Sequence, residues 1–161
     1  RIVRAMPNTP SLVGAGVSGL CAGPGVDGED RELAGRMLGS VGSVVWVEDE
    51  ARMDGVAAVS GSGPAYVFHF IEALEAAARA RGFDAQDARR LAIETVLGAA
   101  KLAAASEDGP GVLRERVTSK GGTTAAALAV FAEGGFVDLV DRAVAAAEAR
   151  GRSLGEELGR S

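Results

Sequence analysis

The chain has 161 residues, and 17 Lys+Arg against 22 Asp+Glu give it a formal net charge of −5. Its length suits one domain or one domain with part of another, and 47% hydrophobic with 24% charged residues are typical of a globular protein. The mild acidity argues against a nucleic-acid partner, no apolar run reaches the roughly 18 residues of a membrane-spanning helix, and the single cysteine excludes an internal disulfide, so we expect a cytoplasmic protein without a membrane partner.

Up to about residue 50 the sequence alternates between strand and helix signals. Residues 1–6, 17–22 and 43–47 are short apolar or β-branched runs that predict strands. Residues 29–38 carry acidic residues in the first turn and apolar residues at helical spacing, which predicts a helix. The chain opens directly on a strand-like run without an initiator methionine, so we interpret it as the C-terminal part of a longer protein.

After residue 50 the apolar residues recur with the period of a helix. Of the 31 alanines in the chain 27 lie in this part, so we expect helices that pack closely through small side chains. Helices are predicted over residues 64–81, from the cap Asp84 to before Gly109, over 125–132, and over 137–150 before Gly151. The predicted fold is α+β and mostly helical, with a strand–helix–strand piece over residues 1–50 and an all-α module over residues 51–161.

Two glycine runs have the spacing of a dinucleotide-binding loop. The run over residues 14–19 leads into a strand, so no helix N-terminus follows it to hold a pyrophosphate. The run over residues 23–28 lies between a strand and a helix, and Glu48 follows its last glycine by 20 residues. Asp27 and the acidic residues after it crowd the place of the pyrophosphate, and their repulsion would cancel the attraction of the helix end. We therefore favour an acid-capped helix start there and keep cofactor binding as the alternative.

The segment from Val117 to Thr124 joins two adjacent glycines to hydroxyl side chains, directly ahead of an apolar helical run. Gly121 and Gly122 carry no Cβ, so successive backbone N–H groups can converge, and the following helix adds the positive end of its dipole. Hydroxyls surround this point, from Thr118, Ser119, Thr123 and Thr124. The pattern predicts a cradle for a small anion such as a carboxylate. A tight turn with a threonine N-cap is the alternative.

A second dense motif, Ser60-Gly61-Ser62-Gly63-Pro64-Ala65-Tyr66, interrupts a helical pattern over residues 53–59. A helix restarts at Pro64, so we predict a tight kink with a structural purpose. His69 has no second metal-ligand candidate at helical spacing, and Cys21 is expected to be a small buried hydrophobe. The sequence shows no metal signature and no nucleophile–base pair, which gives a hydrolase little support.

Three motifs in fixed order point to one family: Met6-Pro7-Asn8-Thr9-Pro10, the segment from Ser60 to Tyr66, and the segment from Val117 to Thr124. Together they resemble the pyrroline-5-carboxylate reductases, enzymes of the last step of proline biosynthesis, from residue 1 to about residue 155. The resemblance implies an NAD(P)-dependent oxidoreductase that delivers a hydride from NADPH or NADH to the C=N carbon of 1-pyrroline-5-carboxylate and forms L-proline. A protonated cyclic imine is already a good electrophile, so such an enzyme needs positioning more than a strong acid, base or metal.

The resemblance also implies a division of the chain. The family places its cofactor fingerprint in an N-terminal Rossmann half, and residues 1–50 are similar to the last strands of that half. Residues 51–161 are similar to the helical domain of the family, which forms the dimer and binds substrate. We therefore expect that the isolated chain is inactive, because it lacks most of the cofactor domain.

Individual residues take roles from the same resemblance. The backbone amides of Gly121, Gly122 and Thr123, with the Ser119 side chain, would hold the substrate carboxylate. Thr124 would be the catalytic residue, with a hydrogen bond at the ring nitrogen. Three positions lie outside this loop: Glu50 matches an acidic residue near the substrate amine, with Glu48 and Asp49 as alternatives, while Asn8 and Arg116 match positions toward the nicotinamide.

The implied partners are the small-molecule substrate and a second copy of the chain, in a homodimer or an oligomer of dimers. Two other functions stay open. One is a dimerisation module without catalysis, and the other is a related imine or keto reductase. The preference between NADH and NADPH stays open too, because the residue that contacts the ribose 2′ position would lie outside this chain.

Overall fold

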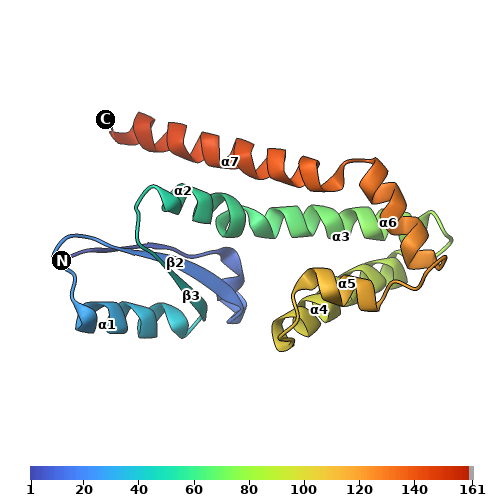
Figure 1. Ribbon diagram of the computed structural model, residues 1–161, viewed down its shortest axis with the longest axis horizontal. Coiled ribbons are helices and arrows are strands. Elements are labelled where there is room, and N and C mark those ends of the chain that lie inside the picture. Colours follow the sequence, from blue (N-terminus) through green and yellow to red (C-terminus); the bar gives the residue numbers. More distant parts are fainter. Residues whose placement is uncertain (160–161) are drawn as a thin grey trace. The chain divides into compact units, whose positions relative to one another are not determined.

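The computed structural model describes residues 1–159, and their contacts divide them into two compact units. The first comprises residues 1–66 together with residues from 141 onward, and the second comprises residues 67–140. Figure 1 shows the elements in chain order. The prediction of a mostly helical α+β fold is confirmed. The predicted division into a cofactor-domain piece over residues 1–50 and a helical domain over residues 51–161 stays a prediction.

The first unit is built on a three-stranded sheet with the order β1-β2-β3. The strand β1 (Val3–Met6) pairs antiparallel with β2 (Gly16–Ala22), and β2 pairs in parallel with β3 (Gly42–Val47). In this register Cys21 of the central strand lies opposite Arg4 on one side and opposite Val47 on the other. All three strands form where the sequence predicts them.

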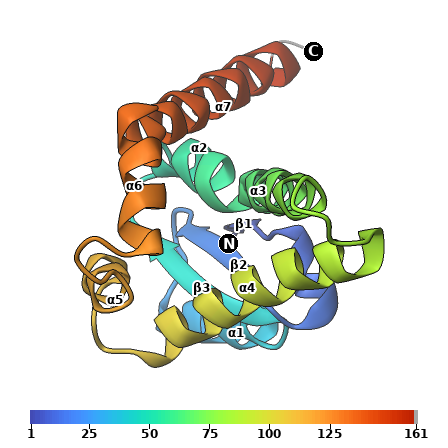
Figure 2. The ribbon, with the colours of Figure 1, turned by 90° about the vertical axis from the view of Figure 1, so that its right-hand side faces the viewer.

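Helices cover both faces of this sheet (Figures 1 and 2). The helix α1 (Gly28–Gly39) packs against β2 and β3, whereas α2 (Arg52–Val56) packs against β2. A Cβ on Gly19 would collide with the side chain of Val56, so this glycine lets α2 lie directly on the strand. Leu20, the next residue, points to the opposite face and is fully buried. The core of the unit therefore surrounds β2.

Two short turns join these elements. The 3-10 turn η1 (Thr9–Val13) connects β1 to β2 and is not predicted from the sequence. The π turn η2 (Ala57–Gly61) connects α2 to α3 (Gly63–Arg79), and within it the Ser62 N–H donates to the Ala57 carbonyl five residues earlier, at 2.8 Å. The interruption predicted at this motif takes the form of a π turn, and the kink itself stays a prediction.

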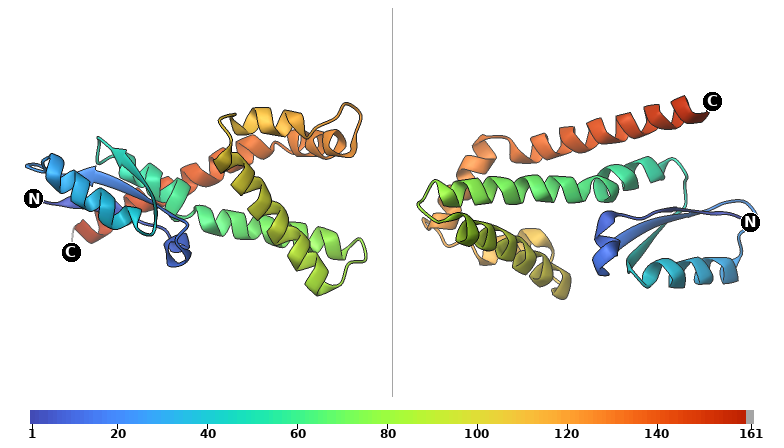
Figure 3. Two further views of the ribbon diagram at one scale, coloured as in Figure 1. Left: turned by 90° about the horizontal axis from the view of Figure 1, so that it is seen from below. Right: turned by 180° about the vertical axis from the view of Figure 1, so that it is seen from behind.

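The second unit is helical. After α3 the chain turns at Gly82, whose φ is +92°, and continues as α4 (Ala85–Ala105), which diverges from α3 at a wide angle (Figure 3). The predicted cap at Asp84 is confirmed, because its Oδ1 accepts a hydrogen bond from the Asp87 N–H at 2.8 Å. Three helices follow, namely α5 (Pro110–Arg116), α6 (Thr123–Glu133) and α7 (Phe136–Gly159).

Two helix boundaries differ from the prediction. The helix α7 does not end before Gly151 but continues to residue 159, so that prediction was wrong. A glycine inside a helix costs only about 1 kcal/mol, and the ion pairs from Arg150 to Glu157 and from Arg152 to Glu148 both span it. The helix α5 is not predicted, because Gly109 and Pro110 indicate the end of α4. They also begin the next helix, with Gly109 as its N-cap and Pro110 in its first turn.

The second unit buries little of its own apolar surface. Among residues 67–140 only Ala88 and Ala92 are buried, and both lie on α4. Large apolar side chains of every helix stay exposed, among them Phe68, Leu97, Leu102, Val130 and Val137. No single helix within residues 1–159 is long and apolar enough to span a membrane, and α6 with the following α7 passes the same test only as a pair bent by 51°.

Candidate functional site

The predicted anion cradle lies in the loop between α5 and α6. Gly121 has a φ of +72°, a left-handed conformation that glycine adopts without strain. Gly122 follows in an extended conformation and is the N-cap of α6, with its N–H bonded to the Ser119 carbonyl at 3.0 Å. The two glycines thus make the turn that leads into the helix.

The start of α6 has no side-chain cap. The threonine N-cap considered as the alternative is therefore wrong, because Gly122 occupies the cap position and Thr123 and Thr124 lie in the first turn. A Cβ at residue 122 would collide with Ser119 Oγ, which lies beside the cap. The first-turn N–H groups are free of any capping side chain and lie at the positive end of the helix dipole, which suits a carboxylate.

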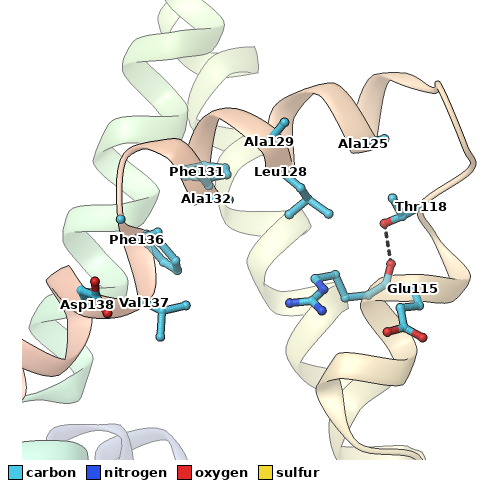
Figure 4. Close-up of a pocket in the computed structure, with 12 residues that line it drawn as sticks. Glu115, Thr118, Ala125, Leu128, Ala129, Phe131, Ala132, Phe136, Val137 and Asp138 are labelled. Carbon is cyan, nitrogen blue, oxygen red and sulfur yellow. Dashed lines mark hydrogen bonds between the residues drawn. The ribbon is translucent and has the colours of Figure 1, made fainter.

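The hydroxyls around this helix start do not all have the same environment. Thr118 Oγ1 donates to the Arg114 carbonyl at 2.6 Å, so it ties the loop back to α5 (Figure 4). The hydroxyls of Ser119, Thr123 and Thr124 form no hydrogen bond with any residue of the described range 1–159. Thr124 is half-buried, whereas Ser119 and Thr123 are exposed. Three of the four predicted hydroxyls can therefore bind a ligand.

A pocket of about 710 Å³ lies next to this loop, between α5, α6 and the start of α7. Its lining includes Thr118 and Ala125 at the end near the loop, but its centre is apolar, with Leu128, Phe131 and Phe136 (Figure 4). The rings of Phe131 and Phe136 lie 5.4 Å apart. None of the predicted ligands of the carboxylate lines this pocket, so the anion site and the apolar pocket are separate features.

Arg116, at the end of α5, forms an ion pair with Asp108 in the turn that precedes this helix. The Arg116 side chain stays 61% exposed, so the pair leaves much of the guanidinium accessible. Asp108 is a partner that the sequence analysis does not identify. Asp108 lies outside the helix that carries Arg116, so helical periodicity does not indicate the pair.

Glu50, in the first unit, lies in the turn between β3 and α2. Its carboxylate pairs with Arg4 of β1, and its backbone carbonyl accepts from the Met53 N–H at 3.0 Å. Burial raises the pKa of the neighbouring Cys21 thiol, and the Glu50 carboxylate beside it raises that pKa further. The alternative residue Asp49 instead accepts a hydrogen bond from the Ala51 N–H at 2.9 Å. Glu50 thus links β1, β2 and α2.

Asn8 uses both ends of its carboxamide within the first unit. Its Oδ1 accepts from the Val17 N–H at 2.9 Å, and its Nδ2 donates to the Ser60 carbonyl at 3.0 Å. An amide NH₂ has two hydrogens, so one donor remains for another partner. Sequence analysis does not identify the contact with Ser60, although Pro64, which lacks an N–H, is a signal for it.

The glycine run before α1 does not fit a pyrophosphate. Asp27 caps α1 by accepting from the Asp30 N–H, and Asp30 in turn accepts from the Asp27 N–H, which completes a capping box. Arg1 pairs with both carboxylates. The helix start is therefore already occupied by two acidic side chains, which confirms the favoured interpretation of an acid-capped helix. Within residues 1–159 no three acidic, histidine or cysteine side chains form a metal-binding group.

Comparison with known proteins identifies one family. A model described as pyrroline-5-carboxylate reductase dimerisation matches residues 50–154. The chain is 48% identical to the pyrroline-5-carboxylate reductase of Pseudomonas aeruginosa over 158 residues, which are 98% of this chain and 58% of that protein. The enzyme of that name from Synechocystis is 44% identical, over 97% of this chain and 58% of its own length.

Solved structures give the same result. A pyrroline-5-carboxylate reductase from Coxiella burnetii superposes with a TM-score of 0.94 at 46% identity, over 96% of this chain and 57% of that one. Plasmodium falciparum pyrroline carboxylate reductase, solved with NADP bound, superposes with a TM-score of 0.87 at 33% identity, over 96% of this chain and 63% of its own. The chain spans less than two thirds of the length of the curated relatives described above.

Proposed function

Because the chain belongs to the pyrroline-5-carboxylate reductase family, we propose that it forms the substrate-binding and dimerisation part of an enzyme that reduces 1-pyrroline-5-carboxylate to L-proline with NADPH or NADH. The observation that carries the proposal is the glycine N-cap of α6, which leaves the first-turn amides free beside three unpaired hydroxyls. The substrate is a small carboxylate, and this helix start has the charge and the donors to bind one.

In this proposal the amides of Gly121, Gly122 and Thr123, with the Ser119 hydroxyl, hold the carboxylate of the substrate. The Gly122 N–H bonds the Ser119 carbonyl at 3.0 Å in this structure, so the carboxylate would have to share or replace that bond. Thr124 is the catalytic residue, and its hydroxyl forms a hydrogen bond at the ring nitrogen. It is half-buried and has no partner within the described residues, so it is free to make that bond. Positioning of the imine relative to the hydride donor is the main contribution that such a site makes to the rate.

The remaining predicted residues contribute less directly. Glu50 would lie near the substrate amine, although it is paired with Arg4 in this structure. Asn8 would use its second amide hydrogen toward the nicotinamide, and Arg116 would use the exposed part of its guanidinium. The nicotinamide supplies the hydride when it is bound. We assign the pyrophosphate to no described residue, because the acid-capped start of α1 does not fit it.

The second partner in the proposal is another copy of the chain. A unit that buries only Ala88 and Ala92 among residues 67–140 has no sufficient core of its own, and a homodimer would cover its exposed apolar side chains. An oligomer of dimers and a cytoplasmic location stay predictions.

A chimera tests this function. In it, the present chain replaces the matching 58% of the Pseudomonas aeruginosa protein, so that the cofactor-binding part comes from that relative. We expect NADPH- or NADH-dependent reduction of 1-pyrroline-5-carboxylate by the chimera and none by residues 1–161 alone, because a hydride donor without an anchor does not reach the substrate. A folded but inactive chimera, beside an active relative, would contradict the function. Turnover by residues 1–161 alone would show that the cofactor site lies within this chain.

A further inference from the structure

The π turn η2 leaves one carbonyl without its usual helical partner. In an α-helix a carbonyl accepts from the N–H four residues later. For Ser60 that residue is Pro64, which has no N–H, and the next amide, of Ala65, donates to the Ser62 carbonyl at 3.0 Å. The Ser60 carbonyl therefore needs a donor from another segment, since a partly buried backbone acceptor without one is unfavourable.

Asn8 is that donor. Its Nδ2 bonds the Ser60 carbonyl at 3.0 Å while its Oδ1 accepts from the Val17 N–H at 2.9 Å, so one carboxamide connects the π turn to β2. The neighbouring carbonyl of Ala58 also lacks its helical donor, because the Ser62 N–H bonds Ala57 instead, and there the Tyr66 hydroxyl donates at 3.1 Å. Side chains thus supply the donors for the Ser60 and Ala58 carbonyls of the turn.

We propose that Asn8 is a positioning residue that replaces the amide that Pro64 lacks and thereby fixes the start of α3 on the sheet. This inference goes beyond the proposed function and does not depend on it. Because Pro64 has no N–H, the Ser60 carbonyl lacks a donor from its own helix, and the Asn8 side chain donates to it instead. The two residues come from two of the three motifs that indicate the family, so these motifs form one connected structure rather than two independent sites.

Asn8→Asp removes the relevant bond, because a carboxylate still accepts from the Val17 N–H but cannot donate to Ser60, and it turns an acceptor oxygen toward that carbonyl. Hydrogen–deuterium exchange of the amides over residues 60–66 measures the effect on the 161-residue chain, and we expect it to accelerate about tenfold. Pro64→Ala returns an N–H four residues after Ser60. In that background we expect Asn8→Asp to change the exchange by less than about twofold.

Ser60→Ala is the matched control. It removes the hydrogen bond from Ser60 Oγ to the Val56 carbonyl, 2.8 Å long, in the same turn but leaves the Ser60 carbonyl unchanged. Ser60→Ala should change the amide exchange over residues 60–66 equally in the parent chain and in the Pro64→Ala background. An effect of Asn8→Asp that is equally large in both backgrounds overturns the proposal. If Asn8→Asp alone does not fold, recovery of the folded chain in the double variant supports the proposal, and continued failure to fold overturns it.

Discussion

Removal of the Thr124 hydroxyl tests the candidate site at the scale of a single residue. This hydroxyl lies in the first turn of α6 without a capping bond, so it contributes little to the stability of the helix. In the chimera, Thr124→Ala should lower kcat/KM about ten- to hundredfold, because one hydrogen bond to a charged or developing-charge group is lost. The melting temperature should change little. Steady-state kinetics and thermal unfolding of the same variant measure both effects.

Thr95→Ala is the matched comparison, because it makes the same substitution at an exposed residue of α4 to which the proposal gives no role. Its kcat/KM should stay near that of the parent. A fall in stability with intact kinetics for Thr124→Ala would remove this threonine from the catalytic site and assign it to the helix start alone.

The buried Cys21 thiol should make the stability of the chain decrease at alkaline pH. Burial, and then the Glu50 carboxylate, raise the pKa of the Cys21 thiol above its value in the unfolded chain, so the folded state holds its proton more strongly. The contribution of Cys21 to the free energy of unfolding is therefore fully present below the unfolded pKa of about 8.5. It is lost as the pH rises through the higher folded pKa. Urea unfolding between pH 7 and pH 10 should show a steeper alkaline loss for the parent than for Cys21→Ala. Equal slopes would mean that Cys21 is not the group responsible.

At the residue scale the sequence predicts contacts that are local and misses those that are not. The cradle over residues 119–124 follows from two adjacent glycines directly ahead of a helix. The bonds of Asn8 to Ser60 and of Glu50 to Arg4 join residues that are 52 and 46 positions apart, so no periodicity in the sequence indicates them. The roles that the resemblance implies for Asn8 and Glu50 could therefore not include these bonds.

At the scale of elements, helix starts are predicted better than helix ends. Asp84 begins α4 as expected because the cap bond involves only neighbouring residues. The predicted end of α7 was wrong because a glycine stop signal is weak, and ion pairs that span Gly151 favour continuation. The π turn could be predicted only as a kink, since its form depends on Asn8 and Tyr66 from outside the turn.

The cap of α4 gives a prediction at this scale. Asp84→Ala removes the acceptor of the Asp87 N–H and should lower the free energy of unfolding by about 1 kcal/mol. Asp84→Asn keeps a side-chain oxygen at the same place and should recover most of that loss. Denaturant unfolding followed by circular dichroism compares the three proteins. If alanine and asparagine are equally destabilising, the charge of Asp84 at the helix start matters rather than its hydrogen bond.

At the scale of the whole molecule, the exposed helices predict association. The second unit cannot form a core from Ala88 and Ala92 alone, and interfaces that complete such helical units commonly bury more than about 2,000 Å². We expect the 161-residue chain to sediment as a dimer at micromolar concentration. Leu97→Glu places a charge on α4 at a side chain that is 42% exposed in the single chain, and it should shift the protein toward monomer with a loss of helical signal.

Leu12→Glu is the matched control for this last experiment. Leu12 is 90% exposed on η1, in the first unit, so the same change of charge there should leave the dimer intact. If the unsubstituted chain sediments as a folded monomer at micromolar concentration, the helices of the second unit are stable without a partner, and the proposed homodimer is wrong. If both glutamate variants dissociate, net charge rather than the face of α4 controls association. Dissociation by Leu97→Glu alone places the interface on the helical unit. A charge that becomes buried between two apolar surfaces destabilises the dimer, whereas a charge that stays in water does not.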